Sequence, residues 1–564
     1  MVPKRKPLGI GFVLLAAATS LFAAEPDSVL GPIIELPKFE VVDSRLLPPP
    51  EKWHYAELPG FELLSNISER ETKRFARDFL LLQEVIDAIM PGLTRSQSPV
   101  PTALFLCGRG KGFDEFLPPE RAEERYRVNG LFFQNTERSA IVVDFALSEL
   151  RLDNDTVEES DPYRAFYLEY FRYLIRRQVS KLPPPWFEEG LVQIFAAMDF
   201  NRKWITFAQI GDGFGAEKIG DFNRRLQQRA LIPFKQFLES DQVRSRDAFW
   251  AAQSYAWVHM CLYGMNKKFQ RPFVKYLARL ERDSPTEEIF KECFGKTYNQ
   301  MALELRGYLG FTVHTAIQFT AKKGQELPEP PAIALRDAPD AVVGRLKGEV
   351  LRLGGHGEKA HNALIAPYVR GERDPRLLAA LGLDERLSGH DDRARKFLEA
   401  AAAANVDRAR AYLELGRLRL AEALAKPAGA EGRLDAKQLQ AVLAPLNTAR
   451  TKSPKMAEVY TTIAEAWANS AEPPGREDFA VVVEGVQSFP RSVPLVFQAA
   501  LLAAGRGLPE EARSLANHGL KIATDDAQRD QFNLLVSALA RDAEPNQAPA
   551  PPPAAPAGPP VFLK

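Results

Sequence analysis

The spacing of apolar residues predicts a chain that begins with a mixed strand-and-helix region and continues as helices. Four apolar runs have the length of strands, at 61–66, 102–107, 130–134 and 140–145. Between the first two runs, apolar residues recur at helical spacing from Phe75 to Ile86; Ser68 suits the start of this helix and Pro91 its end. The chain is therefore predicted to be mostly α, with a small sheet near its N-terminal end.

Helical spacing dominates from residue 163 onward. A helix at 163–177 and a second helix that opens at Trp186 are separated by three prolines at 183–185. Prolines at 328–331 mark a linker into the last region. Two helices that meet at a proline turn are a place where chemistry is expected.

Residues 247–309 are predicted to form three further helices. The first of them is the most apolar and is expected to be the most buried. His259 and Tyr255 on this helix are expected to be packed residues with satisfied polar tips, because isolated polar side chains on an apolar helix are more often structural than functional.

A repeat of 34 residues organises the region after residue 326. Three glycines and two alanines recur at this step: Gly348, Gly382, Gly416, Ala360 and Ala394. This step is typical of tetratricopeptide (TPR) repeats, in which helical pairs stack into a solenoid, and small residues let the two helices of a pair approach closely. The pattern breaks at an insertion near 426–435, and diverged helical pairs resume around 459–467 and 496–502.

The N-terminal residues have the layout of a secretory signal. Three basic residues at 4–6 precede an apolar run at 8–24, and a polar stretch follows. We therefore expect residues 1–24 to be a signal peptide and the protein to be exported to the bacterial cell envelope, either periplasmic or secreted. Phe22 stands where cleavage prefers a small residue, so an uncleaved anchor is the alternative, and a membrane partner is expected only in that case.

Proline-rich segments flank the predicted domains. Residues 25–52 form a Pro-rich lead-in that we expect to lie against the first domain. Residues 545–564 are mostly proline and alanine with almost no charge, which predicts a disordered tail. The two domains between these segments are expected at 53–325 and 326–544.

The charge balance argues against one class of partner. The chain has 73 Lys and Arg and 73 Asp and Glu, and loss of the signal peptide would leave a net charge near −3. Proteins that bind nucleic acid by neutralising phosphates carry a basic excess, so no nucleic-acid partner is expected.

The most informative motif lies across the proline turn. Trp186, Glu189 and Gly190 form a W-x-x-E-G sequence, and Glu169 lies on the helix before the turn. This part of the chain resembles a bacterial group of gluzincin-type metallopeptidases, whose preceding helix carries H-E-x-x-H. The resemblance implies an α+β zincin-like domain, a small sheet plus helices, followed by the all-α TPR-type helical solenoid. It also implies that Glu169 takes the place of the general base and Glu189 that of the third zinc ligand.

Two positions depart from that family. Leu168 and Arg172 stand where the resemblance places the two zinc-binding histidines. Leucine has no lone pair for a metal and arginine stays protonated, so we expect no metal, no other cofactor and no catalytic residue, with Glu169 and Glu189 vestigial. Arg172 is predicted to pair with both carboxylates in place of the ion. The alternative is an ordinary exposed pair of Glu169 and Arg172.

Three functions are compatible with this sequence. The one we favour is a non-catalytic exported protein, in which the peptidase-like domain and the concave surface of the solenoid bind or scaffold a protein or peptide. The second is an active peptidase or other hydrolase that uses Glu169 and Glu189 in an atypical site, against which Arg172 argues, because a fixed cation disfavours protonation of either carboxylate. In the third, the peptidase-like domain is purely structural and the solenoid alone carries the function.

Overall fold

The computed structural model describes most of the chain. The described residues are 34–38, 49–94, 100–108, 112–146, 151–153, 156–158, 162–178, 182–208, 226–240, 248–310 and 317–543. The predicted signal peptide, the predicted tail and most of the lead-in lie outside these residues. Within them, no helix has both the length and the apolar character that crossing a membrane requires.

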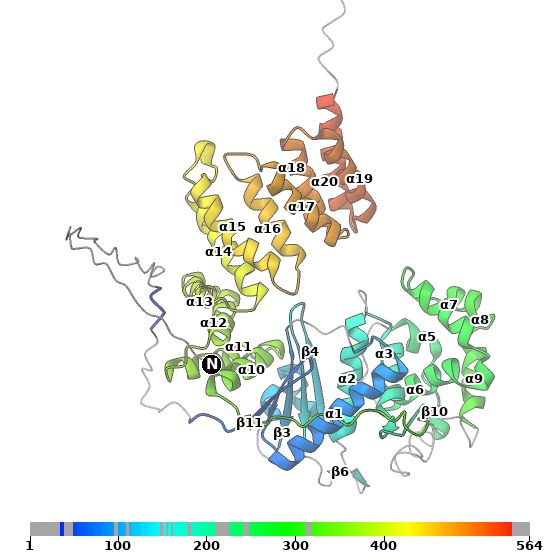
Figure 1. The fold of residues 1–564 in the computed structure, drawn as a ribbon. Helices are drawn as coiled ribbons and strands as arrows, with labels where there is room; N and C mark the ends of the chain where they lie inside the picture. Colours follow the sequence, from blue (N-terminus) through cyan, green and yellow to red (C-terminus); the bar gives the residue numbers. More distant parts are fainter. Residues whose placement is uncertain are drawn as a thin grey trace, which may run out of the picture.

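A six-stranded mixed sheet lies near the start of the described chain (Figure 1). In spatial order its strands are β11 (Arg336–Asp337), β1 (His54–Leu58), β2 (Phe61–Ser65), β3 (Thr102–Cys107), β5 (Ser139–Asp144) and β4 (Gly130–Gln134). β2, β3 and β5 run parallel, whereas β1, β4 and β11 pair antiparallel with their neighbours. The four runs of strand length in the sequence correspond to β2, β3, β4 and β5. β11 is only two residues long and therefore carries no periodicity that a sequence could reveal.

The two faces of the sheet are covered by helices from distant parts of the chain. Leu63 belongs to the core shared with α1 (Glu69–Ile89), whereas the next residue, Leu64, belongs to the core shared with α10 (Asp340–Leu353). α1 starts as the sequence predicts, because the side chain of Ser68 accepts a hydrogen bond from a backbone N–H of the first turn. Since α10 opens the C-terminal helical region, the sheet and that region share a core across the boundary expected at 325/326.

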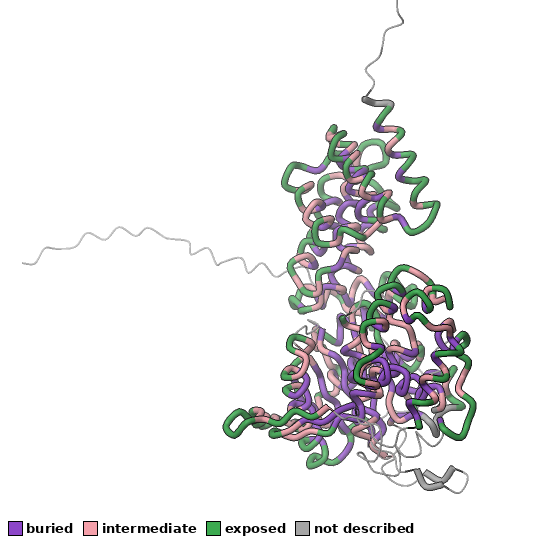
Figure 2. The backbone as a smooth tube through the Cα atoms, turned by 90° about the vertical axis from the view of Figure 1, so that its right-hand side faces the viewer, coloured by how far each residue is buried: buried purple, intermediate pink, exposed green. Residues whose placement is uncertain are grey.

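Most of the other elements that the structure describes before residue 310 are helices. They are α2 (Pro162–Gln178), α3 (Pro185–Ala196), α5 (Phe234–Glu239), α6 (Ala248–Leu262), α7 (Gln270–Leu280), α8 (Glu287–Phe294) and α9 (Tyr298–Leu309). α6 is the buried helix that its composition predicts, and Figure 2 shows the buried residues concentrated inside this part of the molecule.

The prediction of three helices at 247–309 is wrong, because α6, α7, α8 and α9 make four. Gly295 takes a left-handed conformation with φ of 67° and ends α8. Two residues later Thr297 starts α9 through a capping box with Gln300. The glycine stop and the cap that follows it separate α8 from α9.

A strap connects this helical part back to the sheet. A three-stranded sheet of β8 (Asp199–Phe200), β9 (Trp204–Phe207) and β10 (Ile317–Thr320) starts it. The backbone N–H of Leu327 then donates to Arg202 O at 2.9 Å, and the strap continues along α1 to β11 (Figure 1). The predicted proline linker is therefore an extended segment packed on the first domain.

Residues 340–543, which the structure describes without a gap, form a stack of helical hairpins. After α10 they are α11 (Gly357–Val369), α12 (Pro375–Leu387), α13 (Asp391–Ala403), α14 (Ala409–Ala425), α15 (Ala436–Thr451), α16 (Ala457–Ala468), α17 (Arg476–Ser488), α18 (Val493–Gly505), α19 (Pro509–Ile522) and α20 (Asp526–Ala543). The stack rises away from the sheet toward α20 (Figure 1). The diverged pairs predicted after the insertion correspond to α16 and α18 with their partners.

The glycines of the 34-residue step lie where two helices of a hairpin touch. A Cβ added to Gly348 would lie 2.5 Å from Leu364 Cγ, and one added to Gly382 would lie 2.6 Å from Leu398 Cγ, so neither site has room for a side chain. Gly416 faces Leu446 in the same way, at 2.5 Å from Leu446 Cδ2. Ala360 and Ala394 are fully buried beside these contacts. Small residues therefore let the helices approach as the sequence predicts, and a leucine of the second helix fills the space opposite each of the three glycines.

The described part of the lead-in contacts the solenoid. Leu36 packs at the edge of the solenoid core, and Tyr368 of α11 donates a hydrogen bond to Pro37 O at 2.7 Å. For residues 34–38, the expectation that this segment lies against the first domain is therefore wrong, because Leu36 packs against the solenoid core instead.

Candidate functional site

The predicted motif residues lie at the contact between α2 and α3. Pro185 occupies the first turn of α3, where a missing N–H costs nothing, and Trp186 is fully buried against the later helices. Gly190 lets α3 touch α6, since a Cβ there would lie 2.5 Å from Ser254 O. Trp186 and Gly190 of the W-x-x-E-G motif therefore have packing roles.

Arg172 lies among the carboxylates of both helices. Its Nε donates to Glu169 Oε2 at 3.2 Å, and its Nη2 donates to Glu189 Oε2 at 3.2 Å. Glu188 Oε1 lies 4.0 Å from Arg172 Nη1, and the two oxygens of Glu188 accept hydrogen bonds from Arg176. The predicted pairing of Arg172 with Glu169 and Glu189 is thus present, with Glu188 as a third carboxylate that the sequence did not single out.

The cluster is largely withdrawn from solvent. The side chain of Arg172 is 14% exposed and that of Glu189 is 3% exposed, which contradicts the alternative of an ordinary exposed pair. Burial alone would lower the pKa of Arg172, but Glu169, Glu189 and Glu188 together raise it above its ordinary value. The guanidinium is therefore a fixed positive charge at neutral pH.

These residues do not fit the zinc ion that the resemblance implies. Leu168 offers no ligand atom, and the Arg172 guanidinium lies between Glu169 and Glu189 and takes one oxygen of each. Across the described residues, no group of three His, Cys, Asp or Glu side chains has a metal-holding arrangement. No catalytic step through a metal can be derived from this arrangement.

His259 on α6 has a structural environment. It is fully buried, its Nδ1 lies 2.7 Å from Tyr308 Oη, and its Nε2 lies 2.8 Å from Ala208 O. Both ring nitrogens are satisfied, as expected for a packed histidine. Burial raises the pKa of Tyr255 well above its ordinary value, which keeps its hydroxyl neutral.

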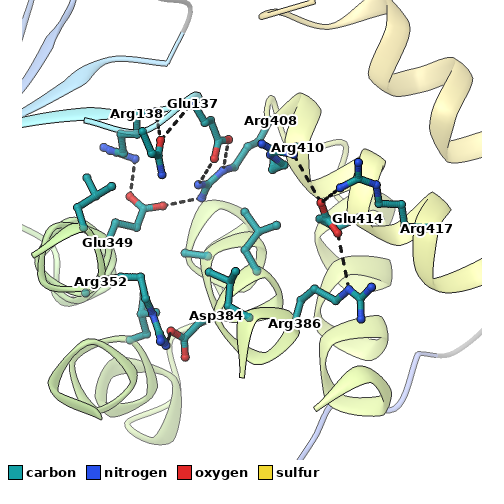
Figure 3. A pocket seen from close by; sticks show the side chains of 17 residues that line it. Glu137, Arg138, Glu349, Arg352, Asp384, Arg386, Arg408, Arg410, Glu414 and Arg417 are labelled. Carbon is teal, nitrogen blue, oxygen red and sulfur yellow. Dashed lines mark hydrogen bonds and ion pairs between the residues drawn. The ribbon is translucent and has the colours of Figure 1, made fainter. Parts of the chain in front are cut away.

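A second candidate site lies where the β4–β5 turn meets the solenoid. A pocket of about 550 Å³ is lined by the turn and by the first helices of three successive hairpins, α10, α12 and α14 (Figure 3). Six arginines and four carboxylates line it, an excess of two positive charges. The sequence did not predict a pocket at this place.

One side of the pocket is a closed network of ion pairs. Glu137 at the tip of the turn accepts two hydrogen bonds from Arg408, at 2.9 and 3.0 Å, and Arg408 also donates to Glu349 of α10 at 2.5 Å. Arg138 pairs with Glu349 and with Glu62 of β2. Burial would raise the pKa of Glu137, but Arg408 lowers it below its ordinary value. This side fastens the sheet to the solenoid.

The other side of the pocket is open. Three arginines surround the carboxylate of Glu414: Arg417 Nη1 donates to it at 2.8 Å, and the nearest nitrogens of Arg386 and Arg410 lie 3.6 Å away (Figure 3). On their outer sides, Arg386 also pairs with Asp391, and Arg410 lies 3.7 Å from Glu458. The side chains of Arg386 and Arg417 are 32% and 35% exposed. Leu387 beside them is 72% exposed, so an apolar surface adjoins the charges.

A signal for this pocket does exist in the sequence. Arg352 and Arg386 both line the pocket and lie 34 residues apart, each four positions after a repeat glycine. Arg417 directly follows the third glycine, Gly416. Positions at a fixed offset from a repeat glycine share one face of the stack, so tracing polar residues by that offset would have found part of the site.

Residues 340–543 therefore contain a TPR-type helical region. No protein-family model matches the chain, and no curated protein matches it. Solved structures similar to it include YrrB, "a TPR protein with an unusual peptide-binding site" (13% identity, 34% of this chain and 92% of YrrB, TM-score 0.29). MamA (18% identity, 31% and 93%, TM-score 0.26) and TTC0263, a thermophilic TPR protein in Thermus thermophilus (19% identity, 35% and 97%, TM-score 0.26), also match. With TM-scores this low, the likenesses carry no argument about function.

Proposed function

We propose that this protein binds or scaffolds other polypeptides through the face formed by α10, α12 and α14. The observation that carries the proposal is the pocket of about 550 Å³ on that face, lined by charged and apolar side chains from three hairpins. Stacked helical hairpins offer an extended surface on which a peptide can contact several repeats at once. We take this face to be the concave surface on which the sequence places a protein or peptide partner.

We further propose that the region before the strap is a non-catalytic relative of the gluzincin-type metallopeptidases. The position of Arg172 between Glu169 and Glu189 supports this, because a working site would need that space for a metal or a protonated acid. A purified chain incubated with zinc and then exchanged into metal-free buffer should keep less than about a tenth of an equivalent by elemental mass spectrometry. Retention of about one equivalent would contradict this part of the proposal.

The cell envelope remains the proposed location, on the basis of the N-terminal signal layout. A periplasmic or secreted protein that binds polypeptides without cleaving them is consistent with a predicted signal peptide followed by a binding solenoid. Expression of the full chain with its own N-terminus, followed by mass measurement of the product, would show whether residues 1–24 are removed.

Peptide binding is tested with the full-length chain and an array of immobilised peptides of varied composition. Hydrogen–deuterium exchange with a bound peptide should show added protection on α10, α12 and α14, and mass spectrometry should recover the peptide uncleaved. Absence of binding across the array would contradict the proposed function. Protection confined to α2 and α3, with cleavage of the peptide, would favour the hydrolase alternative.

A further inference from the structure

We infer that the open side of the pocket recognises an internal Asp or Glu side chain of an extended peptide, next to an aliphatic residue. The inference rests on the proposed function and names the chemistry of the partner. The site consists of Arg386, Arg410 and Arg417 around Glu414, with Leu387 at its edge.

A contact within the molecule shows how this face binds a glutamate side chain. Glu137 sits in a turn of extended chain, and Arg408 at the start of α14 binds its carboxylate with two nitrogens. The neighbouring turn residue Thr136 accepts a hydrogen bond from Arg410 at 3.2 Å. The β4–β5 turn therefore docks on the solenoid as an acidic peptide would, through an internal side chain and not through a chain end.

Arg386, Arg410 and Arg417 each have more N–H donors than the hydrogen bonds described for them. Arg410 donates one hydrogen bond to Thr136, Arg417 donates one to Glu414, and Arg386 donates one to Asp391 at 2.6 Å. At longer range, Arg410 Nη2 lies 3.7 Å from Glu458, and Arg386 and Arg410 each have a nitrogen 3.6 Å from Glu414. A guanidinium has five N–H donors in a planar fork that suits a carboxylate. A ligand carboxylate among these three side chains would therefore gain hydrogen bonds that Glu414 alone does not take up.

The surroundings define what stands beside that carboxylate. Leu387 exposes 72% of its surface next to Arg386, and Leu383 and Leu353 also line the pocket. An exposed leucine is stabilised when an apolar partner covers it, because apolar surface is removed from water. The preferred ligand is thus a segment in which an acidic residue is flanked by Leu, Ile, Val or Phe.

The test compares matched peptides on the full-length chain by fluorescence anisotropy. All peptides are acetylated and amidated so that they carry no terminal charge, and they contain either Glu-Leu-Glu, Gln-Leu-Gln or Glu-Ser-Glu in the same flanks. We expect the Glu-Leu-Glu peptide to bind at least about tenfold more tightly than the Gln peptide, with a preference that shrinks as salt is raised. We expect the Ser peptide to bind severalfold more weakly.

Two variants of the chain locate the effect, and one serves as a control. The double substitution Arg386→Gln, Arg417→Gln should remove the preference for Glu over Gln. Glu414→Gln should tighten binding of the acidic peptide, because it removes the carboxylate that competes for the same three arginines. Arg419→Gln is the matched control, since Arg419 also lies on α14 and is 30% exposed but does not line the pocket.

Each outcome decides something different. Equal affinity for the Glu and Gln peptides, or a preference that survives the double substitution, would overturn the inference and leave the proposed function standing. A Gln-Leu-Gln peptide with a free C-terminal carboxylate serves as a separate fourth probe, and binding of this peptide as tight as that of the Glu-Leu-Glu peptide would overturn the inference in favour of chain-end recognition. If the peptide array also yields no ligand, the proposed function fails with it.

Discussion

Two clusters of charged residues in this molecule each surround one central side chain, and the central charge has the opposite sign in the two clusters. On α2 and α3, one arginine, Arg172, is shared by three carboxylates. Between α12 and α14, one carboxylate, Glu414, is shared by three arginines. The first cluster is closed between packed helices, and the second opens into a pocket.

The difference separates charges that hold a fold from charges that meet a partner. Arg172 cannot be removed without leaving buried carboxylates unpaired, and such loss is expensive because a charge without a partner is poorly solvated there. Arg386 and Arg417 are about one-third exposed, so water can replace any single contact that they lose. Stability should therefore respond strongly to the first cluster and weakly to the second, whereas ligand binding should respond in the opposite way.

The largest expected effect is that of Arg172→Ala. Removal of the guanidinium leaves Glu169 and Glu189 without their ion-pair partner, whereas Glu188 keeps Arg176, and we expect the free energy of unfolding to fall by about 3 kcal/mol or more. Urea denaturation followed by tryptophan fluorescence measures it, since Trp186 and Trp257 lie in the same core. A change within about 0.5 kcal/mol would show that the cluster behaves like an exposed surface.

Arg74→Ala on α1 is a suitable control for that measurement. Arg74 is 70% exposed and its nearest carboxylate oxygen, on Asp78, lies 3.8 Å away. Its removal should change the free energy of unfolding by less than about 0.5 kcal/mol. A loss as large as that of Arg172→Ala would mean that the burial of an arginine does not determine how much it contributes to stability.

Glu62 predicts a second effect, on the network that joins the sheet to α10. Burial would raise the pKa of Glu62, but Arg345 and Arg138 lower it from 4.5 to about 2. A carboxylate whose pKa is lower in the folded chain stabilises the fold above its unfolded pKa, and this contribution is lost as the pH falls through the folded value. The stabilisation is therefore present at pH 6 and disappears between about pH 4.5 and pH 2.

The measurement compares the wild type with Glu62→Gln across that window. Between pH 6 and pH 3 the wild type should lose about 2 kcal/mol more unfolding free energy than the variant, which has no group to protonate at this position. Denaturation curves at both pH values give the two losses. Equal losses would mean that Glu62 is not held ionised by Arg345 and Arg138.

The pairing of Arg172 with Glu169 and Glu189 was predictable from the sequence, whereas Glu188 and most of the open cluster were not. Arg172 is three residues from Glu169 on one helix, and a motif placed Glu189 opposite, so local spacing contained the contact. Glu137, by contrast, meets Arg408 from 271 positions away, and only the packing of α10 onto the sheet brings them together. The 34-residue step indicates which residues of the stack share a face, but it does not predict that the β4–β5 turn docks on that face.

The smallest expected effect on stability is that of Arg417→Gln, and it is the sharpest contrast to Arg172→Ala. Arg417 shares Glu414 with Arg386 and Arg410, so the carboxylate keeps two cationic neighbours when the first is removed. We expect the free energy of unfolding to change by less than about 0.5 kcal/mol, measured under the same conditions as for Arg172→Ala. A loss of about 2 kcal/mol or more, on the scale of a buried pair, would place Arg417 among the residues that hold the fold. The open side of the pocket would then be a structural network like the one around Arg408.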